Sequence, residues 1–367
     1  MSTVMSECDI LVLSASFGWG HNSVAAAICE HLKLEDNSLQ VCIKDIMDIF
    51  APRIKPFGTA FYNMLTRNSP SLYNVLYNIK RDHPNNFLDE IIYDRYIDRF
   101  GDYLLEVKPK LIISTFPLGS GFVSRAKDKF DIQIPLITAI TDVVDSWEWI
   151  HNNTDLYFVP CKVVENRLVE KGINREKIRV TGIPVRHDFL VKENHTSEMR
   201  DQRQILIMGG AMKKIILTKS MLMHFEKMEN TKIVVVTGND TELYKKLNRY
   251  GPFKNIEVIG FSNEIASLME ASDLVVTKPG GATLFEAINK GVPVVLKRSK
   301  VGQEEENLKF IEDHGLGVLI EDEDNLETII AGMVFDDERL EQVEKNLEEL
   351  RAEFDSEMIG KYILELL

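Results

Sequence analysis

The sequence predicts an α/β protein built from two doubly wound domains, each a parallel β-sheet covered by helices on both faces. Short apolar runs recur along the whole chain, and segments with apolar residues at helical spacing separate them. The chain has 367 residues and is 44% hydrophobic, which is enough for two ordinary cores. Because ligands of such folds bind beyond the carboxyl ends of the strands, we expect two Rossmann-like domains facing a central cleft.

The expected strands divide evenly between the two halves of the chain. In chain order they span 9–14, 40–44, 110–115, 135–140 and 155–159, and then 204–208, 232–236, 256–259, 273–276 and 293–296. Helical patterns fill most gaps, and the last of them, which is acidic, runs from about 336 to 365. The polar, aperiodic stretch 187–204 predicts a linker, so we expect an N-terminal domain over 1–190 and a C-terminal domain over 200–345.

Composition narrows the class of protein. The formal net charge of −14 argues against a nucleic-acid partner, although residues 321–367 alone carry 16 Asp/Glu against 4 Lys/Arg. No apolar run reaches the ~18 residues of a membrane span, and the N-terminal residues lack a signal pattern, so a cytoplasmic protein is expected. The four cysteines are scattered without metal-ligand spacing and are expected to be reduced thiols.

The first expected strand runs directly into a glycine-rich turn, "SASFGWGH" at 14–21. Gly18 and Gly20 allow a sharp turn and a close approach of the backbone to a ligand, and the helix that follows presents free N–H groups. His21 begins that helix, where the positive dipole end disfavours protonation, and a neutral imidazole suits a general base. The alternative is a histidine that only caps its helix or packs in the turn.

Other loops at expected strand ends also carry special residues. In the first half these are Thr115-Phe116-Pro117 and Thr141-Asp142, and in the second half Met208-Gly209-Gly210, Gly260-Phe261-Ser262 and "TKPGGATLFEA" at 277–287. The last of these is a strand, a glycine turn and a helix N-terminus, which together favour a phosphate group. The alternative is a capping box, with Thr283 as N-cap and Glu286 as its partner.

The neighbouring segment "VGQEEENLKF", 301–310, follows another expected strand. Gln303 lies four residues and Glu304 three residues before Asn307, so all three lie near one helix face. Amide and carboxylate groups beside a phosphate site suit the hydroxyls of a sugar. An acidic first turn that complements the helix dipole would explain the glutamates but not Gln303.

Taken together, these motifs resemble those of the monogalactosyl- and diglucosyl-diacylglycerol synthases. This family is a branch of the two-domain GT-B nucleotide-sugar glycosyltransferases, which also include the peptidoglycan glucosaminyltransferase. The resemblance spans nearly the whole chain, in order: "GWGHNSVA", "STFP", "TD" at 141–142, "VTGIPVR" at 180–186, "MGGA" at 208–211, "KPGGATLFEA" and "GQEEEN". It implies an enzyme that transfers glucose or galactose from a UDP-sugar to diacylglycerol.

The resemblance also implies roles for individual residues. The C-terminal domain would hold the donor, with Gly260 and Phe261 against the uracil and Glu286 on the ribose. Further residues are expected to bind the diphosphate and the sugar, and the glycines of the adjoining turns are counted with them. This set is Gly20, Gly209, Gly280, Gly281, Ala282, Thr283, Gln303, Glu304 and Asn307. The final segment, 346–367, would pack back on the N-terminal domain.

The chemistry implied by the resemblance is a single displacement that inverts the anomeric centre. His21 would take the proton of the diacylglycerol hydroxyl, and Asp142 would orient His21 or the acceptor, unless Asp142 only caps the next segment. No metal and no cofactor is expected, because "DED" at 322–324 reads as solvated surface and "DVVD" at 142–145 has the wrong spacing.

A basic segment supports a membrane-bound acceptor. Residues 51–81 contain Arg53, Lys55, Arg67, Lys80 and Arg81, no acidic residue, and the aromatic residues Phe57, Phe61, Tyr62, Tyr73 and Tyr77. Aromatic rings favour the headgroup level and basic side chains favour anionic lipid, so peripheral association with the inner face of the cell membrane is expected. The alternative is an ordinary helix–loop region with core aromatics and solvated charges.

Other classes of protein remain open from the sequence. A dinucleotide-dependent dehydrogenase would use Gly18 and Gly20 with Asp45, but Ser23 replaces the third glycine and the 277–307 motifs stay unexplained. A UDP-sugar 2-epimerase would need no lipid acceptor. A GT-B transferase with another acceptor and a non-catalytic UDP-sugar sensor are further alternatives.

Overall fold

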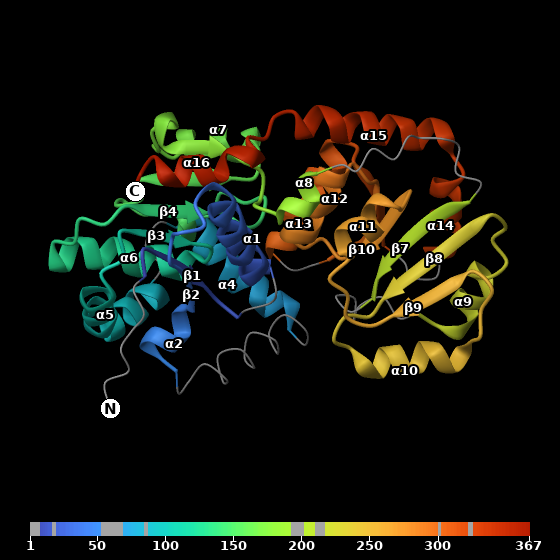
Figure 1. The fold of residues 1–367 in the computed structure, drawn as a ribbon, viewed down its shortest axis with the longest axis horizontal. Coiled ribbons are helices and arrows are strands. Elements are labelled where there is room, and N and C mark those ends of the chain that lie inside the picture. Colours follow the sequence, from blue (N-terminus) through green and yellow to red (C-terminus); the bar gives the residue numbers. More distant parts are fainter. Residues whose placement is uncertain are drawn as a thin grey trace. The chain divides into compact units, whose positions relative to one another are not determined.

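The computed structural model describes residues 8–16, 20–52, 69–83, 87–191, 202–209, 217–299, 302–321 and 326–367. These residues form two compact units. The first comprises Met1–His187, Lys300–Glu306 and Glu353–Leu367, and the second comprises Asp188–Ser299 and Asn307–Ala352. The second unit is therefore not one continuous stretch of chain, and the chain ends in the first unit (Figure 1).

The described part of the first unit contains a six-stranded parallel sheet in the order β2-β1-β3-β4-β5-β6. Its strands are β1 Ile10–Ser14, β2 Val41–Asp45, β3 Leu111–Ser114, β4 Leu136–Ala139, β5 Leu156–Val159 and β6 Ile178–Val180. Every residue of β1, β3, β4 and β5 is buried, which explains their continuous apolar runs. In register, Ile10 lies opposite Val41 on one side and Leu111 on the other.

Helices connect these strands, as parallel pairing requires. They are α1 Gly20–Glu35, α2 Ile46–Phe50, α4 Pro70–Asp82, α5 Phe87–Val107, α6 Pro117–Phe130, the 3₁₀ turns η1 Trp147–Trp149 and η2 Arg175–Lys177, and α7 Lys162–Glu170. Phe122 of α6 centres the core beneath one face, with Phe50, Tyr93 and Phe100 around it at ring distances of 4.7–5.2 Å. The core thereby joins α2 and α5 to α6.

The chain's last residues belong to the first unit. After α15, Asp337–Arg351, the backbone N–H of Asp355 donates to Val180 at the end of β6, and α16, Ile359–Leu364, packs on α1 (Figure 1). Gly360 allows this approach, because a Cβ there would lie 2.6 Å from Glu35 Cγ and 3.0 Å from the His31 carbonyl oxygen. The acidic pattern expected as one helix over 336–365 is thus two helices, separated by the turn η5, Ser356–Met358.

The described part of the second unit contains another six-stranded parallel sheet, in the order β12-β11-β10-β7-β8-β9. Its strands are β7 Arg203–Met208, β8 Thr231–Val236, β9 Ile256–Ile259, β10 Leu274–Thr277, β11 Val294–Lys297 and β12 Gly317–Ile320. Its helices are α9 Lys219–Phe225, α10 Thr241–Tyr250, α11 Ile265–Glu270, α12 Gly281–Lys290 and α14 Leu326–Val334, together with α15; α8 His187–Leu190 and α13 Gly302–Asp313 cross the boundary between the units.

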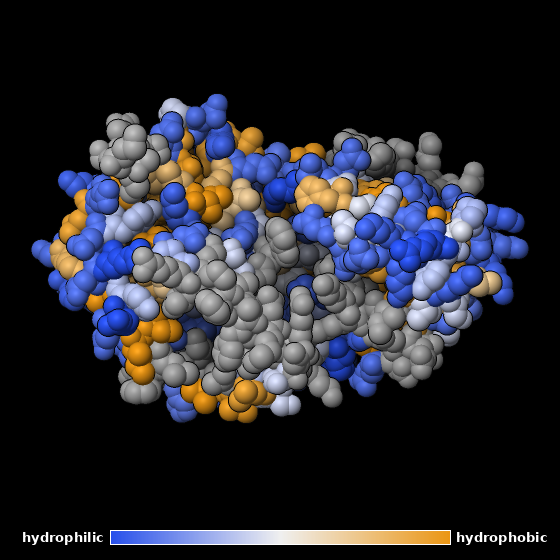
Figure 2. Space-filling model, turned by 90° about the horizontal axis from the view of Figure 1, so that it is seen from below, coloured by the Kyte–Doolittle hydropathy of each residue, from blue (hydrophilic) through white to orange (hydrophobic). Residues whose placement is uncertain are grey.

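The predicted fold class is confirmed, and each expected strand is present to within one or two residues at its ends. The structure adds β6 and β12, which are the outer strands of their sheets. Neither strand is fully buried; β6 has only three residues and no long apolar run, whereas β12 does have an apolar run. None of the described helices combines the length and apolarity needed to cross a membrane. Among the residues that Figure 2 colours, hydrophilic side chains predominate and separate groups of apolar side chains interrupt them.

Candidate active site

His21 lies where the order of the first sheet reverses. From β1 the chain passes to β2 on one side, whereas β3 pairs with β1 on the other, so the carboxyl ends of β1 and β3 flank a topological switch point. Ligands of open parallel sheets bind at such points. The loops after β1, β3 and β4 bring together His21, Thr115 and Thr141 there.

Two oxygen atoms hold the His21 ring by the same nitrogen. Its Nδ1 lies 2.8 Å from the carbonyl oxygen of Thr115 and 3.0 Å from Oγ1 of Thr141. A carbonyl oxygen only accepts hydrogen bonds, so Nδ1 carries the proton and donates it. The lone pair of the neutral ring is therefore on Nε2, and this tautomer gives His21 a basic nitrogen.

Apolar surroundings keep this imidazole neutral. The Phe116 ring meets it edge-on at 5.0 Å between centroids, and the ring of buried Trp149 lies at 6.5 Å. Burial lowers the pKa of His21 to about 4, while the bond to the Thr115 carbonyl opposes that shift. The sequence predicted a neutral histidine from the helix dipole, but desolvation is the largest cause of the lowered pKa.

Thr141 contacts the His21 ring. Thr141 is buried, and its hydroxyl reaches His21 Nδ1, whereas Asp142 is not among the groups that shift the pKa of His21. The role of Asp142, toward His21 or toward the acceptor, stays a prediction. The sequence pattern indicates the loops that contain Thr115 and Thr141 but predicts no role for either threonine.

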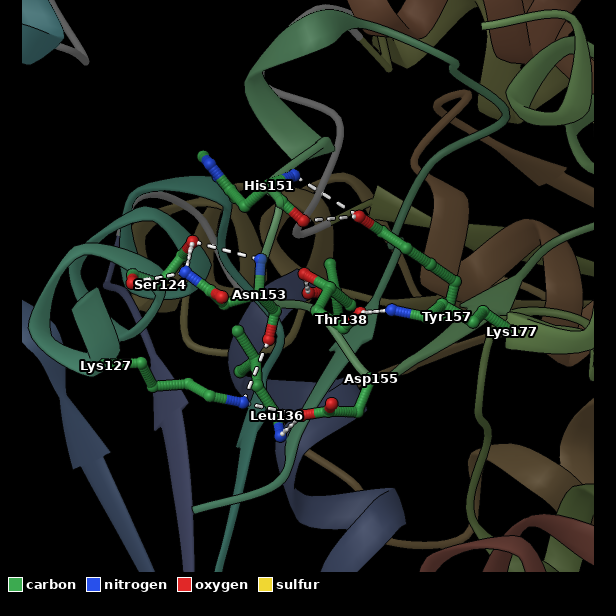
Figure 3. A network of polar contacts seen from close by, with 10 residues as sticks. Ser124, Lys127, Leu136, Thr138, His151, Asn153, Asp155, Tyr157 and Lys177 are labelled. Carbon is green, nitrogen blue, oxygen red and sulfur yellow. Dashed lines mark hydrogen bonds and ion pairs between the residues drawn. The ribbon is translucent and has the colours of Figure 1, made fainter. Parts of the chain in front are cut away.

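A polar network fixes the segment that carries Trp149 (Figure 3). The side-chain amide of Asn153 donates to the Ser124 carbonyl oxygen at 2.9 Å, and Lys127 bridges the Asn153 carbonyl oxygen and Asp155. Tyr157 and His151 are joined through the tyrosine hydroxyl and the histidine backbone at 3.2 Å. Because α6 and β5 both hold this segment, Trp149 has a fixed place beside His21. Nothing local in the sequence pointed to Trp149.

The second sheet has its own switch point, between β7 and β10. Helix α12 begins there at Gly281, and its N-cap is Gly280, in extended conformation and without a side-chain cap. The capping-box interpretation is therefore wrong, because Thr283 is the third helical residue. The backbone N–H groups of Gly281, Ala282 and Thr283 have no carbonyl partner within the helix, so this end of α12 suits an anion.

Asn307 is held against the turn that precedes α12. It is fully buried, and its Nδ2 donates to the Pro279 carbonyl oxygen at 2.9 Å. The amide thus fixes the turn that precedes α12, and a contact of Asn307 with the sugar stays a prediction. Glu286 lies about one turn after the first residue of α12 and is half-buried.

The other residues expected to bind the donor lie at strand ends. Phe261 follows β9 and is 67% exposed, and a Cβ at the adjoining Gly260 would meet open space. An exposed aromatic ring beside an open glycine can stack on a planar base. Gly209 follows β7, where a Cβ would lie 3.4 Å from the Val236 carbonyl oxygen, and Gly20 begins α1 with open space at its Cβ position.

Gln303 lies in the part of α13 that belongs to the first unit. Its Oε1 accepts a hydrogen bond of 2.8 Å from the Tyr73 hydroxyl of α4. Glu304, the next residue in the chain, is half-buried. Their contacts with a sugar stay predictions. In the part of the chain that the structure describes, no group of three or more His, Cys, Asp or Glu residues comes together as a metal site, and metal independence also stays a prediction.

Most of the expected membrane segment lies outside the described residues. This applies to Arg53, Lys55, Phe57, Phe61 and Tyr62, and to the side chain of Lys80. Arg81 is described, and its guanidinium pairs with Asp82 at 2.8 Å and with Glu306 at 3.6 Å. Tyr77, expected at the headgroup level, is only 6% exposed. These two residues therefore fit the interpretation as an ordinary packed helix better than that of a lipid contact.

Two parallel doubly wound sheets, with helices between their strands, define the two-domain GT-B fold. The solved structure of Anabaena HepE in complex with UDP-glucose has the same fold, with a TM-score of 0.52 and 16% identity over 97% of this chain and 98% of that one. Residues 21–185 match the model of the monogalactosyldiacylglycerol synthase family, and residues 204–358 match the glycosyltransferase family 28 C-terminal domain.

Curated relatives resemble the chain over almost its whole length. The processive diacylglycerol beta-glucosyltransferase of Bacillus subtilis is 28% identical over 97% of this chain and 94% of its own length. The protein of the same name from Bacillus cereus strain B4264 is 31% identical over 93% of this chain and 89% of its own length. The chain belongs to the family of the processive diacylglycerol beta-glucosyltransferases.

Proposed function

We propose that this protein is an inverting glycosyltransferase that moves a hexose from a UDP-sugar to the free hydroxyl of diacylglycerol at a membrane surface. The observation that carries the proposal is the tautomer of His21. With Nδ1–H bonded to the Thr115 carbonyl, Nε2 is the atom able to take the proton of an alcohol. The names of the relatives favour glucose over galactose as the transferred sugar.

The reaction is a single displacement. The diacylglycerol oxygen attacks the anomeric carbon while its proton moves to His21 Nε2, and the bond from that carbon to the UDP oxygen breaks. The electron pair leaves with UDP, whose added charge would be held by the N–H groups of Gly281, Ala282 and Thr283. An α-linked donor would thus give a β-glycoside. Phe261 would stack on the uracil and Glu286 would accept hydrogen bonds from the ribose.

The lipid acceptor requires contact with a bilayer, and α4 offers a suitable surface. Its residues Leu72, Val75 and Ile79 are 52%, 55% and 45% exposed and, at spacings of three and four, lie along one side of the helix. An apolar side of this kind can enter the headgroup region, and the basic residues Arg53, Lys55 and Lys80 would add attraction to anionic lipid.

Transfer assays with labelled donors test the function. UDP-glucose, UDP-galactose and UDP-N-acetylglucosamine are each incubated with the protein and vesicles containing diacylglycerol, and the lipid products are resolved. We expect labelled glycosyl-diacylglycerol from UDP-glucose, with the β configuration by NMR. Free labelled sugar without labelled lipid, or no turnover of any donor, would contradict the proposal. Vesicles without diacylglycerol serve as the control.

A further inference from the structure

Helix α4 contacts the segment Gly302–Glu306, and both belong to the first unit. Asn74 Oδ1 accepts from the Gly302 backbone N–H at 3.0 Å, and the Tyr73 hydroxyl donates to Gln303 Oε1 at 2.8 Å. Arg81, two turns further along α4, pairs with Glu306. Three successive polar contacts thus connect one side of α4 to one short segment.

Packing between these contacts is close. Tyr77 is buried, and its ring lies so near the Gly302 backbone that a Cβ at Gly302 would overlap the ring. Asn74 and Tyr77 therefore define where the segment begins. Glu306 also faces Arg167 of α7 at 4.0 Å, and this fixes the other end of the segment.

We propose that Tyr73 is a positioning residue that holds the Gln303 amide in place for the hexose of the donor. This inference rests on the proposed function, in which Gln303 contacts that sugar. A glutamine side chain has three rotatable bonds, and fixing them opposes binding unless another group has already done so. The Tyr73 hydroxyl fixes the amide before the donor arrives. Tyr73 touches Gln303 and needs no contact with the sugar.

The proposed role predicts different effects on the affinities for UDP-glucose and for UDP, whereas a general loss of structure would lower both. UDP-glucose contains the hexose, whereas UDP does not. Removal of the Tyr73 hydroxyl should therefore weaken binding of UDP-glucose and leave binding of UDP unchanged. A merely structural role for Tyr73 would lower the melting temperature and would not distinguish the two ligands.

The experiment compares Tyr73→Phe, Gln303→Ala and the double variant by calorimetric titration with UDP-glucose and with UDP. We expect each single variant to raise the Kd of UDP-glucose about three- to tenfold, the range that one neutral hydrogen bond supports. The double variant should resemble Gln303→Ala, because the hydroxyl acts through the amide. Tyr362→Phe is the matched control, since it also removes a tyrosine hydroxyl bonded at 3.0 Å, to Asp355.

The outcomes distinguish a failure of the positioning role of Tyr73 from a failure of the proposed function. If Gln303→Ala raises the Kd of UDP-glucose and Tyr73→Phe does not, the positioning role is overturned and the sugar contact stands. If neither variant changes that Kd while the wild type transfers hexose, both roles are wrong and the proposed function stands. If Tyr73→Phe weakens UDP and UDP-glucose equally, the residue is only structural. Failure of the wild type to transfer hexose would be a failure of the function itself.

Discussion

The Nδ1 atom of His21 lies 2.8 Å from the carbonyl oxygen of Thr115. In many enzymes that use histidine as a base, a carboxylate fixes the tautomer. Here a backbone carbonyl does so, and it adds no negative charge that would raise the pKa of the ring to its usual value. The result is an imidazole that stays neutral over the physiological range and exposes one defined nitrogen.

Replacement of His21 by alanine should lower transfer about 10²–10⁴-fold, because the alcohol would lose its proton acceptor. Binding of UDP should stay normal, since the residues expected to hold UDP belong to the second unit. Initial rates with saturating donor, together with titration of UDP, measure both quantities. A variant that keeps more than about a tenth of the wild-type rate would exclude His21 as the base.

Thr141→Val removes the second oxygen from His21 Nδ1 while nearly keeping the shape of the side chain. We expect kcat to fall about three- to tenfold, in line with the loss of one hydrogen bond to the ring, and the KM for the donor to stay unchanged. Thr237→Val is the control, because Thr237 is also buried and donates to a carbonyl oxygen, that of Ile259 at 3.1 Å. Equal losses of kcat in both variants would argue against a specific effect at His21.

Glu286→Ala tests the predicted ribose contact. A carboxylate that accepts from ribose hydroxyls makes charge-assisted hydrogen bonds of roughly 1.5–3 kcal/mol each, so the Kd of UDP should rise about tenfold or more. The N-cap of α12 is Gly280, so loss of a capping box does not enter the result. Glu305→Ala, at an exposed position in α13, is the control. Unchanged affinity for UDP in a folded Glu286→Ala protein would exclude Glu286 as the residue that binds the ribose.

Two sets of substitutions test the membrane contact by flotation with anionic liposomes at low and high salt. Arg53, Lys55, Lys80 and Arg81 changed together to Glu should reduce binding mainly at low salt, because each basic residue contributes about 1 kcal/mol that salt screens. Because Arg81 is paired with Asp82 and Glu306, we expect the smallest share from it.

Leu72, Val75 and Ile79 changed together to Ser should reduce flotation at both salt concentrations, since burial of apolar surface does not depend on charge. Binding of UDP is the folding control for both sets. If both variants float as well as the wild type, the membrane surface lies elsewhere on the protein.

Histidines with lowered pKa make stability depend on pH. Burial, with Arg125 as the next cause, lowers the pKa of His151 to about 4, below its ordinary value of 6.5. Between these two values the unfolded chain binds a proton that the folded protein does not, so the free energy of unfolding should fall as the pH drops from 6.5 toward 4. The slope is about 1.4 kcal/mol per pH unit for this residue, and His21 adds its own contribution. Urea unfolding of the wild type and His151→Gln at pH 7 and pH 5 should show a smaller loss in the variant.

Local sequence patterns were sufficient for most of the fold. The runs that became β1, β3 and β10 are apolar because each residue is buried on both faces of a parallel sheet. The short outer strand β6 was missed because such burial is incomplete there, whereas β12, Gly317–Ile320, has an apolar run that could have been detected.

The sequence by itself determined which loops carry chemistry, because a glycine turn between a strand and a helix is a local feature. This holds for His21 after β1 and for Gly281 after β10. Only the tertiary structure decided that Thr115 and Thr141 bind the His21 ring, that Asn307 fixes the Pro279 turn, and that Tyr73 reaches Gln303. The members of these pairs are 28 to 230 residues apart in sequence. Such contacts depend on the order of the strands and on side-chain packing, and no local periodicity contains that information.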